Sequence, residues 1–176
     1  MILFYQRSDA PTFNPLYTHL PQETIDSLYK HVEPGTGRRY NLADIAGPGG
    51  GWISSPAGAY AADPTLAGKA TFGFVSRYQK GASLPSGNTE FQFQTAGLTF
   101  HATSFDWLIV NKAGLNAQFK GWGTINGTGS YGFMIWATDG SPDTFRIAIT
   151  DGNGGVVYDN HVAQAIGGGS IVVRTN

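Results

Sequence analysis

The stretch GPGGGWISSPAGAY (Gly47–Tyr60) places three consecutive glycines before a tryptophan, and IGGGSIVV (Ile166–Val173) repeats this arrangement near the end of the chain. Glycine-rich loops that hold phosphate need a lysine and a hydroxyl residue directly after the glycines, at the start of a helix. Instead, Trp52 and Ile53 follow the first run and Ile171 follows the second, and these residues favour strands. We therefore predict that each run leads into a β-strand and that the two strands lie near each other.

The composition narrows the possible classes of protein. A chain of 176 residues suits one domain with a sizeable core. The net charge of −1 argues against a nucleic-acid partner, and no apolar run approaches the ~20 residues of a membrane helix, so we expect no membrane insertion. The absence of cysteine excludes disulfides and thiolate metal sites. The low share of charged residues is typical of secreted β-sandwiches and predicts a secreted or extracellular protein, although the opening MILFYQRSDAP is not a signal peptide.

Glycine divides the chain into two regions. Residues 1–46 contain only Gly35 and Gly37, and all other glycines follow, which predicts an N-terminal arm over 1–46 and a β domain over 47–176. Four residues of the arm recur at helical spacing and predict one short helix: Ile25, Leu28, Tyr29 and Val32. The arm is too apolar to remain solvated, so we expect it to dock on the β domain, on a neighbouring subunit or on other domains of the same secreted protein.

The region from 47 to 176 predicts an all-β fold, an antiparallel β-sandwich with jelly-roll-like connections and about 8–10 strands. Phe91 and Phe93 alternate with Glu90 and Gln92, as expected for a strand with one buried face. Eight segments rich in aromatic and β-branched residues are bounded by turn residues: 71–80, 89–95, 98–103, 106–111, 116–125, 130–138, 144–150 and 156–160. Between two of them, the pair Asn126-Gly127 predicts a tight hairpin.

The β region resembles the post-choice-of-anchor domain of secreted multidomain bacterial proteins. The resemblance covers about residues 47–173. Its first part is carried by GGGWISSPAGAYAADPTLAGKATFGFVSRYQKGASLPSGNTEFQF (Gly49–Phe93) and LTFHATSFDWLIV (Leu98–Val110). Its second part is carried by AQFKGWGTINGTGSYGFMIWATDG (Ala117–Gly140), DTFRIAITD (Asp143–Asp151), VVYDN (Val156–Asn160) and AIGGGSIVV (Ala165–Val173). The resemblance implies a non-catalytic extracellular accessory module that acts in adhesion, assembly or structural support, without a cofactor.

Trp122 and Trp136 depart from that family's pattern, which has small polar residues at these positions. Both lie at the parity opposite to the apolar Phe119 and Phe133, so we expect them on one solvent-facing side of the sheet, beside Gln118 and Lys120. Exposed aromatic rings stack on sugars while amides bind the hydroxyl groups, which predicts a carbohydrate site formed by Trp122, Trp136, Gln118 and Lys120. Two alternatives remain: the arm or a partner covers the indoles, or a different register places them in the core.

Two acidic, glycine-rich turns supply a second candidate site. TDGSPD (Thr138–Asp143) and TDGNGG (Thr150–Gly155) offer oxygen atoms of the kind that Ca²⁺ prefers. The possible calcium ligands are Asp139, Asp143, Asp151 and Asn153. Such residues also form β-turns without any metal, and we favour this interpretation because the spacing differs from that of an EF-hand loop.

Catalysis finds little support in the sequence. A glycoside hydrolase needs two carboxylates in a cleft, and the β region has one glutamate, Glu90, with aspartates mostly at turns. The four histidines show no metal-ligand spacing: His19, His31, His101 and His161. We expect His101 to lie on the solvent-facing side of its strand, and we expect no enzymatic activity.

Overall fold

The computed structural model describes residues 31–32, 39–40, 45–79, 82–111 and 115–174, and it divides into two compact units, Met1–Asn41 and Leu42–Asn176. In the first unit, β1 (His31–Val32) pairs antiparallel with β2 (Arg39–Tyr40). Most of the predicted helix, and the predicted docking of the arm, lie outside the described residues. Val32 is an exception. It lies in β1 and pairs with Arg39 of β2, so the helix does not extend to it.

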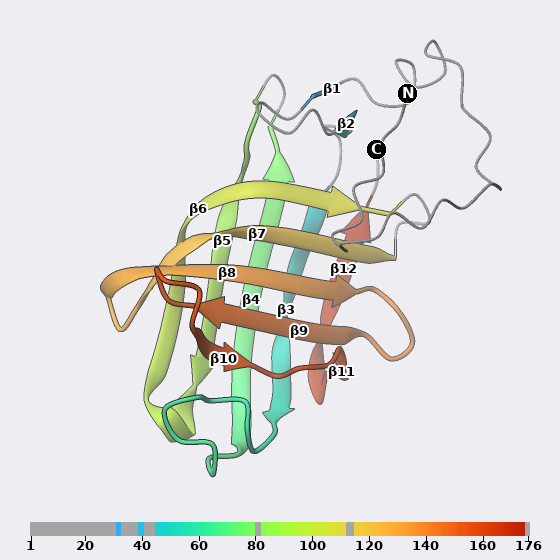
Figure 1. The fold of residues 1–176 in the computed structure, drawn as a ribbon. Helices are drawn as coiled ribbons and strands as arrows, with labels where there is room; N and C mark the ends of the chain where they lie inside the picture. Colours follow the sequence, from blue (N-terminus) through green and yellow to red (C-terminus); the bar gives the residue numbers. More distant parts are fainter. Residues whose placement is uncertain (1–30, 33–38, 41–44, 80–81, 112–114, 175–176) are drawn as a thin grey trace, which may run out of the picture. The chain divides into compact units, whose positions relative to one another are not determined.

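A ten-stranded antiparallel sheet forms the second unit (Figure 1). Its strands are β3 (Ile45–Ser55), β4 (Gly68–Tyr78), β5 (Pro85–Phe93), β6 (Leu98–Val110), β7 (Asn116–Ile125), β8 (Thr128–Thr138), β9 (Thr144–Thr150), β10 (Val156–Asp159), β11 (Gln164–Ala165) and β12 (Gly168–Arg174), with a 3-10 turn, η1 (Gln94–Ala96), before β6. The strand order is β10-β9-β8-β7-β6-β5-β4-β3-β12, and β11 pairs with β9.

This strand order confirms the prediction of an all-β antiparallel fold, but the predicted jelly-roll-like connections between the strands are wrong. From β3 to β10 each strand pairs with its neighbour in sequence, which is a meander and not the order of a jelly roll. The physical reason is the short connections, such as the hairpin at Asn126-Gly127. Both residues have positive φ, 50° and 75°, as a type I′ turn requires, so the hairpin prediction is confirmed. No helix among the described residues has the length and hydrophobicity that a membrane crossing requires.

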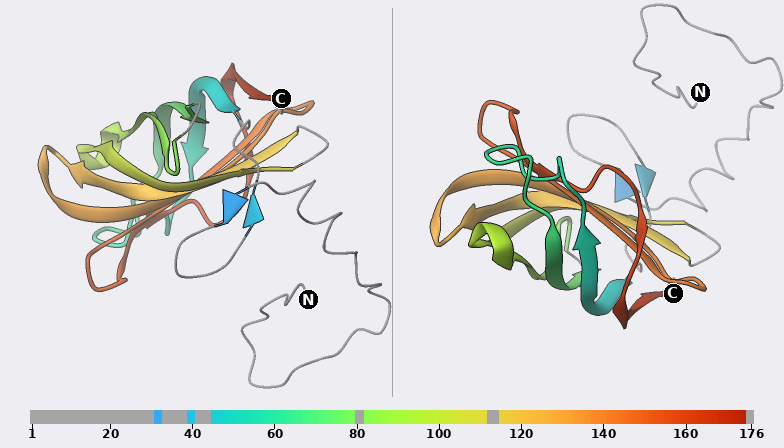
Figure 2. Two further views of the ribbon diagram at one scale, coloured as in Figure 1. Left: turned by 90° about the horizontal axis from the view of Figure 1, so that it is seen from above. Right: turned by 90° about the horizontal axis from the view of Figure 1, so that it is seen from below.

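The sheet folds over on itself at β6. In its first part β6 pairs with β5, while almost its whole length pairs with β7, and two register shifts interrupt that ladder near Thr103 and Asp106. Bulges bend a strand and allow it to serve two layers, so the two predicted segments 98–103 and 106–111 form one strand. The β6–β9 layer crosses the layer of β3, β4, β5 and β12 at a steep angle (Figures 1 and 2).

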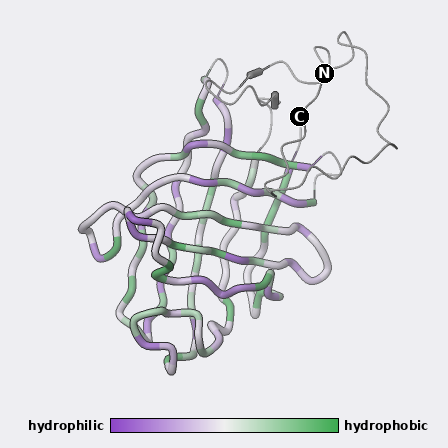
Figure 3. Tube along the Cα trace, in the orientation of Figure 1, coloured by the Kyte–Doolittle hydropathy of each residue, from purple (hydrophilic) through white to green (hydrophobic). Residues whose placement is uncertain are grey.

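Aromatic rings from both layers fill the space between them. Phe72 of β4 and Phe145 of β9 stack with their ring centres 3.8 Å apart and their planes at 2°. Buried and partly exposed residues alternate along both strands. The colour of the chain trace accordingly changes repeatedly between hydrophobic and hydrophilic (Figure 3). The largest fully buried aromatic side chains are Tyr158, Phe91, Phe93, Phe100, Phe119 and Phe145. The core therefore lies between two faces of one folded sheet.

The two glycine runs belong to neighbouring strands and meet at one pair in the ladder of β3 with β12. Gly51 lies opposite Gly169, which confirms that the two strands are neighbours, although the glycines lie within β3 and β12 and do not precede the strands. A Cβ on Gly51 would lie 2.2 Å from a carbonyl oxygen of β12, and one on Gly169, whose φ is +104°, would lie 2.0 Å from a carbonyl oxygen of β3. The ring of Trp52 lies against Gly167, where a Cβ would meet it at 2.3 Å. Glycine is needed here because the backbones and an indole approach too closely for side chains.

The loop between β3 and β4 covers the free edge of β10. The Asp159 N–H donates to the carbonyl of Ala59 at 2.8 Å, and the Ala61 N–H donates to the carbonyl of Val157 at 3.0 Å. Next to these bonds, the hydroxyl of buried Tyr158 donates to Ser55 Oγ at 2.8 Å, and burial raises the pKa of Tyr158 to about 12. These contacts cover one sheet edge, which lowers the risk of pairing with other chains.

Candidate binding site on the outer face of β6 to β9

Trp122 and Trp136 lie on the outer face of the β6–β9 layer. Trp136 pairs with Gln118 across β8 and β7, and Trp122 is 38% exposed. Phe119 and Phe133, at the opposite parity, are buried against the other layer. The prediction that both indoles share the solvent-facing side is therefore confirmed, and the alternative that the register places them in the core is wrong. The other alternative, that the N-terminal arm covers the two indoles, concerns residues outside the described part of the chain.

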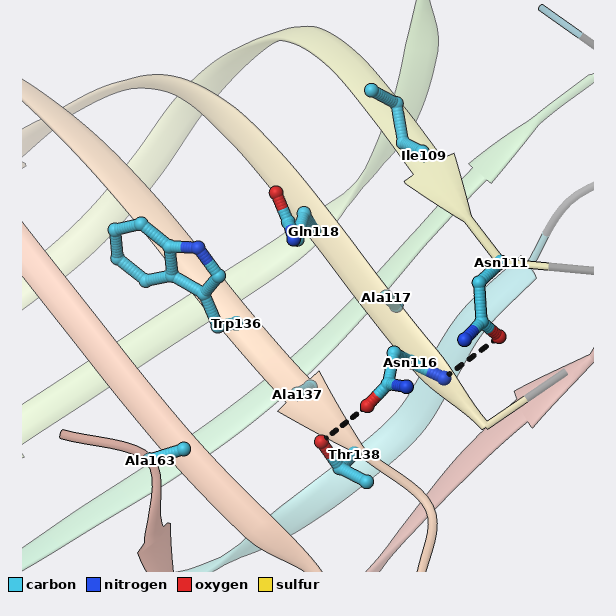
Figure 4. A pocket seen from close by; sticks show the side chains of 9 residues that line it. All are labelled: Ile109, Asn111, Asn116, Ala117, Gln118, Trp136, Ala137, Thr138 and Ala163. Atoms are coloured by element: carbon cyan, nitrogen blue, oxygen red, sulfur yellow. Dashed lines mark hydrogen bonds between the residues drawn. The ribbon is translucent and has the colours of Figure 1, made fainter. Parts of the chain in front are cut away.

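An open hollow of about 360 Å³ lies beside Trp136 at the end of the layer where β6 ends and β7 begins (Figure 4). Its lining includes Ile109, Asn111, Asn116, Gln118, Trp136 and Thr138. The hollow brings together Trp136 and Gln118 of the predicted site. Lys120 and Trp122 lie farther along β7, at exposed positions on the same face but outside the hollow. Trp122 is four residues from Gln118, which corresponds to roughly 13 Å along the strand.

Three polar residues of the hollow did not emerge from the sequence. Asn111 follows the end of β6, and its Oδ1 accepts hydrogen bonds from the Leu115 and Asn116 N–H groups at 3.1 and 3.3 Å. Thr138, at the end of β8, donates through Oγ1 to Asn116 Oδ1 at 2.7 Å. The pairing of β7 with β8, in which Asn116 lies opposite Thr138, creates this cluster. The only sequence signal was the presence of polar residues at adjacent strand ends, which is common in loops.

A charged pair holds one face of the Trp136 ring. The guanidinium carbon of Arg146 lies over the ring, 4.5 Å from its centre. Arg146 Nε and Nη2 donate to the two carboxylate oxygens of Asp159, at 3.1 and 2.9 Å. Burial of Asp159 opposes its ionisation, but hydrogen bonds from Arg146 and from the His161 N–H outweigh this effect and lower the pKa of Asp159 below its usual value. The bond to Asp159 in turn raises the pKa of Arg146. Both groups therefore stay charged at neutral pH and position the indole.

The four residues predicted as calcium ligands fall into two separate groups. Asp139 and Asp143 precede β9 and Asp151 and Asn153 follow it, so the seven residues of β9, roughly 20 Å, lie between the groups. Asp143 Oδ2 accepts the Ile171 N–H at 2.7 Å, and Asp139 Oδ2 accepts the N–H of another β12 residue at 3.0 Å.

Asp151 Oδ1 accepts the N–H groups of Asn153 and Gly155, both at 2.8 Å, as expected of an aspartate in a turn. Across the described part of the chain, no group of three or more His, Asp or Glu residues is arranged to hold a metal ion. Calcium binding stays a prediction, and the described geometry offers the four residues no common site.

Glu90, the candidate acid of a hydrolase, lies on the outer face of the other layer. It accepts a hydrogen bond from Gln92 Nε2 and lies 3.9 Å from Nε2 of His101, its partner across β5 and β6. His101 is exposed, which confirms its predicted position. Among the described residues that line the hollow beside Trp136 there is no Asp, Glu or His.

No protein-family model, curated protein or solved structure matches this chain significantly. The resemblance to the post-choice-of-anchor domain therefore stays a prediction that rests on the quoted segments.

Proposed function

We propose that this chain is a non-catalytic accessory module of a secreted or cell-surface protein and that it acts in adhesion by binding carbohydrate through the outer face of β6 to β9. The observation that carries this proposal is the hollow of about 360 Å³ beside Trp136, whose lining combines this indole with the side-chain amide of Gln118 and, at the strand ends, those of Asn111 and Asn116. An aromatic ring contributes apolar contact with a sugar ring, and amides bind its hydroxyl groups.

The position of Trp122 supports an extended ligand. It lies roughly 13 Å along the strand from the row of Trp136, a distance that suits a chain of several sugar units. Because both indoles belong to β-strands of a packed layer, the spacing is set before the ligand arrives, which lowers the entropic cost of binding.

Affinity electrophoresis of the whole chain through gels that contain soluble polysaccharides tests this function. We expect retardation by at least one polysaccharide, abolished by Trp136→Ala and weakened by Trp122→Ala. Lys69→Gln is the matched control, because Lys69 is exposed on the other layer, where its ammonium lies 5.0 Å from the ring centre of Trp52. No retardation by a broad panel, or equal retardation of Trp136→Ala, would contradict the proposal.

A further inference from the structure

We infer that the hollow beside Trp136 selects acidic sugars, namely the hexuronate units of a polysaccharide, over neutral ones. This inference rests on the proposed function, because it names the ligand of the same site. Three features are relevant to it: the direction of the hydrogen bonds that the asparagines already make, the charges around the hollow, and the position of Arg146 over the Trp136 ring.

The asparagines of the hollow use their oxygens within the protein and leave their NH₂ groups for a ligand. Asn111 Oδ1 accepts two backbone N–H groups, and Asn116 Oδ1 accepts the hydroxyl of Thr138. No hydrogen bond to another described residue occupies Nδ2 of Asn111 or Asn116, and both residues are exposed. Figure 4 shows these amides side by side at the strand ends. The site therefore offers donors, which suit a ligand group that only accepts hydrogen bonds, and an ionised carboxylate is such a group.

The charges on this face favour an anion. Lys120 is two residues from Gln118 on the same face of β7, it is exposed, and no ion pair with another described residue holds its ammonium. Asp106 lies in the bulge of β6 next to Trp107, which pairs with Lys120, but no ion pair joins the side chains of Asp106 and Lys120. The described lining of the hollow contains no carboxylate to repel an anion.

Arg146 adds a further donor beside the indole. Its Nε and Nη2 donate hydrogen bonds to Asp159. Its Nη1 makes no hydrogen bond to another described residue. A hexuronate unit in the hollow thus meets NH₂ donors from Asn111 and Asn116, while the Arg146 guanidinium lies over the Trp136 ring and outside the described lining. A neutral hexose has a hydroxymethyl group in place of the carboxylate. Charge-assisted hydrogen bonds are roughly twice as strong as neutral ones, so the preference is expected in affinity and not only in orientation.

Isothermal titration calorimetry with polygalacturonate and with its fully methyl-esterified form tests the inference, because the two polymers share one backbone and differ in the charge of the carboxyl group. We expect at least about tenfold tighter binding of the free acid. Asn116→Asp keeps the acceptor for Thr138 but replaces the NH₂ donor with an anionic oxygen, and it should weaken binding of the acid more than binding of the ester. Lys120→Gln should act in the same direction, while Lys69→Gln should leave both affinities unchanged.

The outcomes separate this inference from the function beneath it. Tight binding of the acid that is lost in Asn116→Asp and kept in Lys69→Gln supports the inference. Equal binding of acid and ester, or binding of neutral polysaccharides alone with loss in Trp136→Ala, overturns the preference for acids and leaves the proposed function standing. A wild-type chain that binds neither these polymers nor any neutral polysaccharide overturns both.

Discussion

The pairing of β3 with β12 and the pairing of β7 with β8 are both antiparallel, yet the first has glycines where the strands approach most closely, while the second carries two tryptophans on its outer face. Where β3 and β12 approach most closely, Gly51 lies opposite Gly169, because carbonyl groups occupy the space of a Cβ at both positions, and the Trp52 ring occupies it at Gly167. Along β7 and β8 the outer face carries Trp122 and Trp136, because solvent lies beyond it. The comparison teaches that side-chain size in this sheet follows the space outside the ladder, so changes in β3 and β12 should affect stability and changes in β7 and β8 should affect binding.

Gly169→Ala should produce the largest loss of stability. The added Cβ would lie 2.0 Å from the carbonyl oxygen of Gly50 at a φ of +104°, so the backbone must move, and we expect the free energy of unfolding to fall by about 3 kcal/mol or more. Urea unfolding followed by tryptophan fluorescence measures this. Gly73→Ala is the matched control, since its Cβ would meet nothing within 4 Å, and it should change stability by less than about 1 kcal/mol. Equal effects of the two substitutions would contradict the comparison.

Asp159→Asn should lower the free energy of unfolding at pH 7 by about 2 kcal/mol, because Arg146 loses a charged hydrogen-bond partner. The folded-state pKa of Asp159 is lowered, so its contribution is present above the unfolded pKa of about 3.9 and is lost as pH falls through the folded pKa. Urea unfolding at pH 7 and near pH 2 should show the difference between wild type and variant shrinking at the lower pH. A difference that stays constant would exclude the ionised carboxylate as its cause.

Asp143→Ala should cost about 1.5 kcal/mol, because the backbone N–H of Ile171 loses its acceptor on the free side of β12. Hydrogen exchange read residue by residue by NMR should show faster exchange at Ile171. Asp151→Ala removes a carboxylate that binds only its own turn, so it should leave exchange at Ile171 unchanged. Identical exchange in the two variants would show that Asp143 does not secure β12.

Trp122→Ala should have the smallest effect on stability, about 1 kcal/mol or less, because the side chain is partly exposed and packs only on the outer face. Thermal unfolding measures the change, and the same sample in affinity electrophoresis should show weaker retardation. A loss of stability similar to that of Gly169→Ala would mean that the Trp122 ring is part of the packed structure and not of a binding surface.

The sequence predicted most strands because period-two alternation is a local property. The segments 116–125 and 144–150 coincide with β7 and β9, and the parity argument placed Trp122 and Trp136 correctly. The meander order was not predicted, since alternation describes the two faces of a strand and not its neighbours. The segments 98–103 and 106–111 were separated at Ser104 and Phe105, which in the structure belong to the bulged part of β6.

The residues of the hollow were missed for a related reason. Asn116 and Thr138 meet only through the register of β7 with β8, and Asn111 joins them because β6 ends nearby. In sequence each is one polar residue near a turn. The bonds from Asp139 and Asp143 to β12 also join residues about thirty positions apart, which local patterns do not reveal. Long-range register is therefore the information that the local sequence patterns lack.

The return of β12 to β3 also affects the order in which the molecule is completed. As the chain is synthesised, β4 follows β3 directly and can pair with it early. The other neighbour of β3, β12, begins only at Gly168, after every other strand has been made. Until then the unpaired edge of β3 has few side chains to block the approach of another strand. A nascent or truncated chain that ends before Gly168 can therefore associate with other chains along the edge of β3. Pairing of β12 with β3 covers this edge.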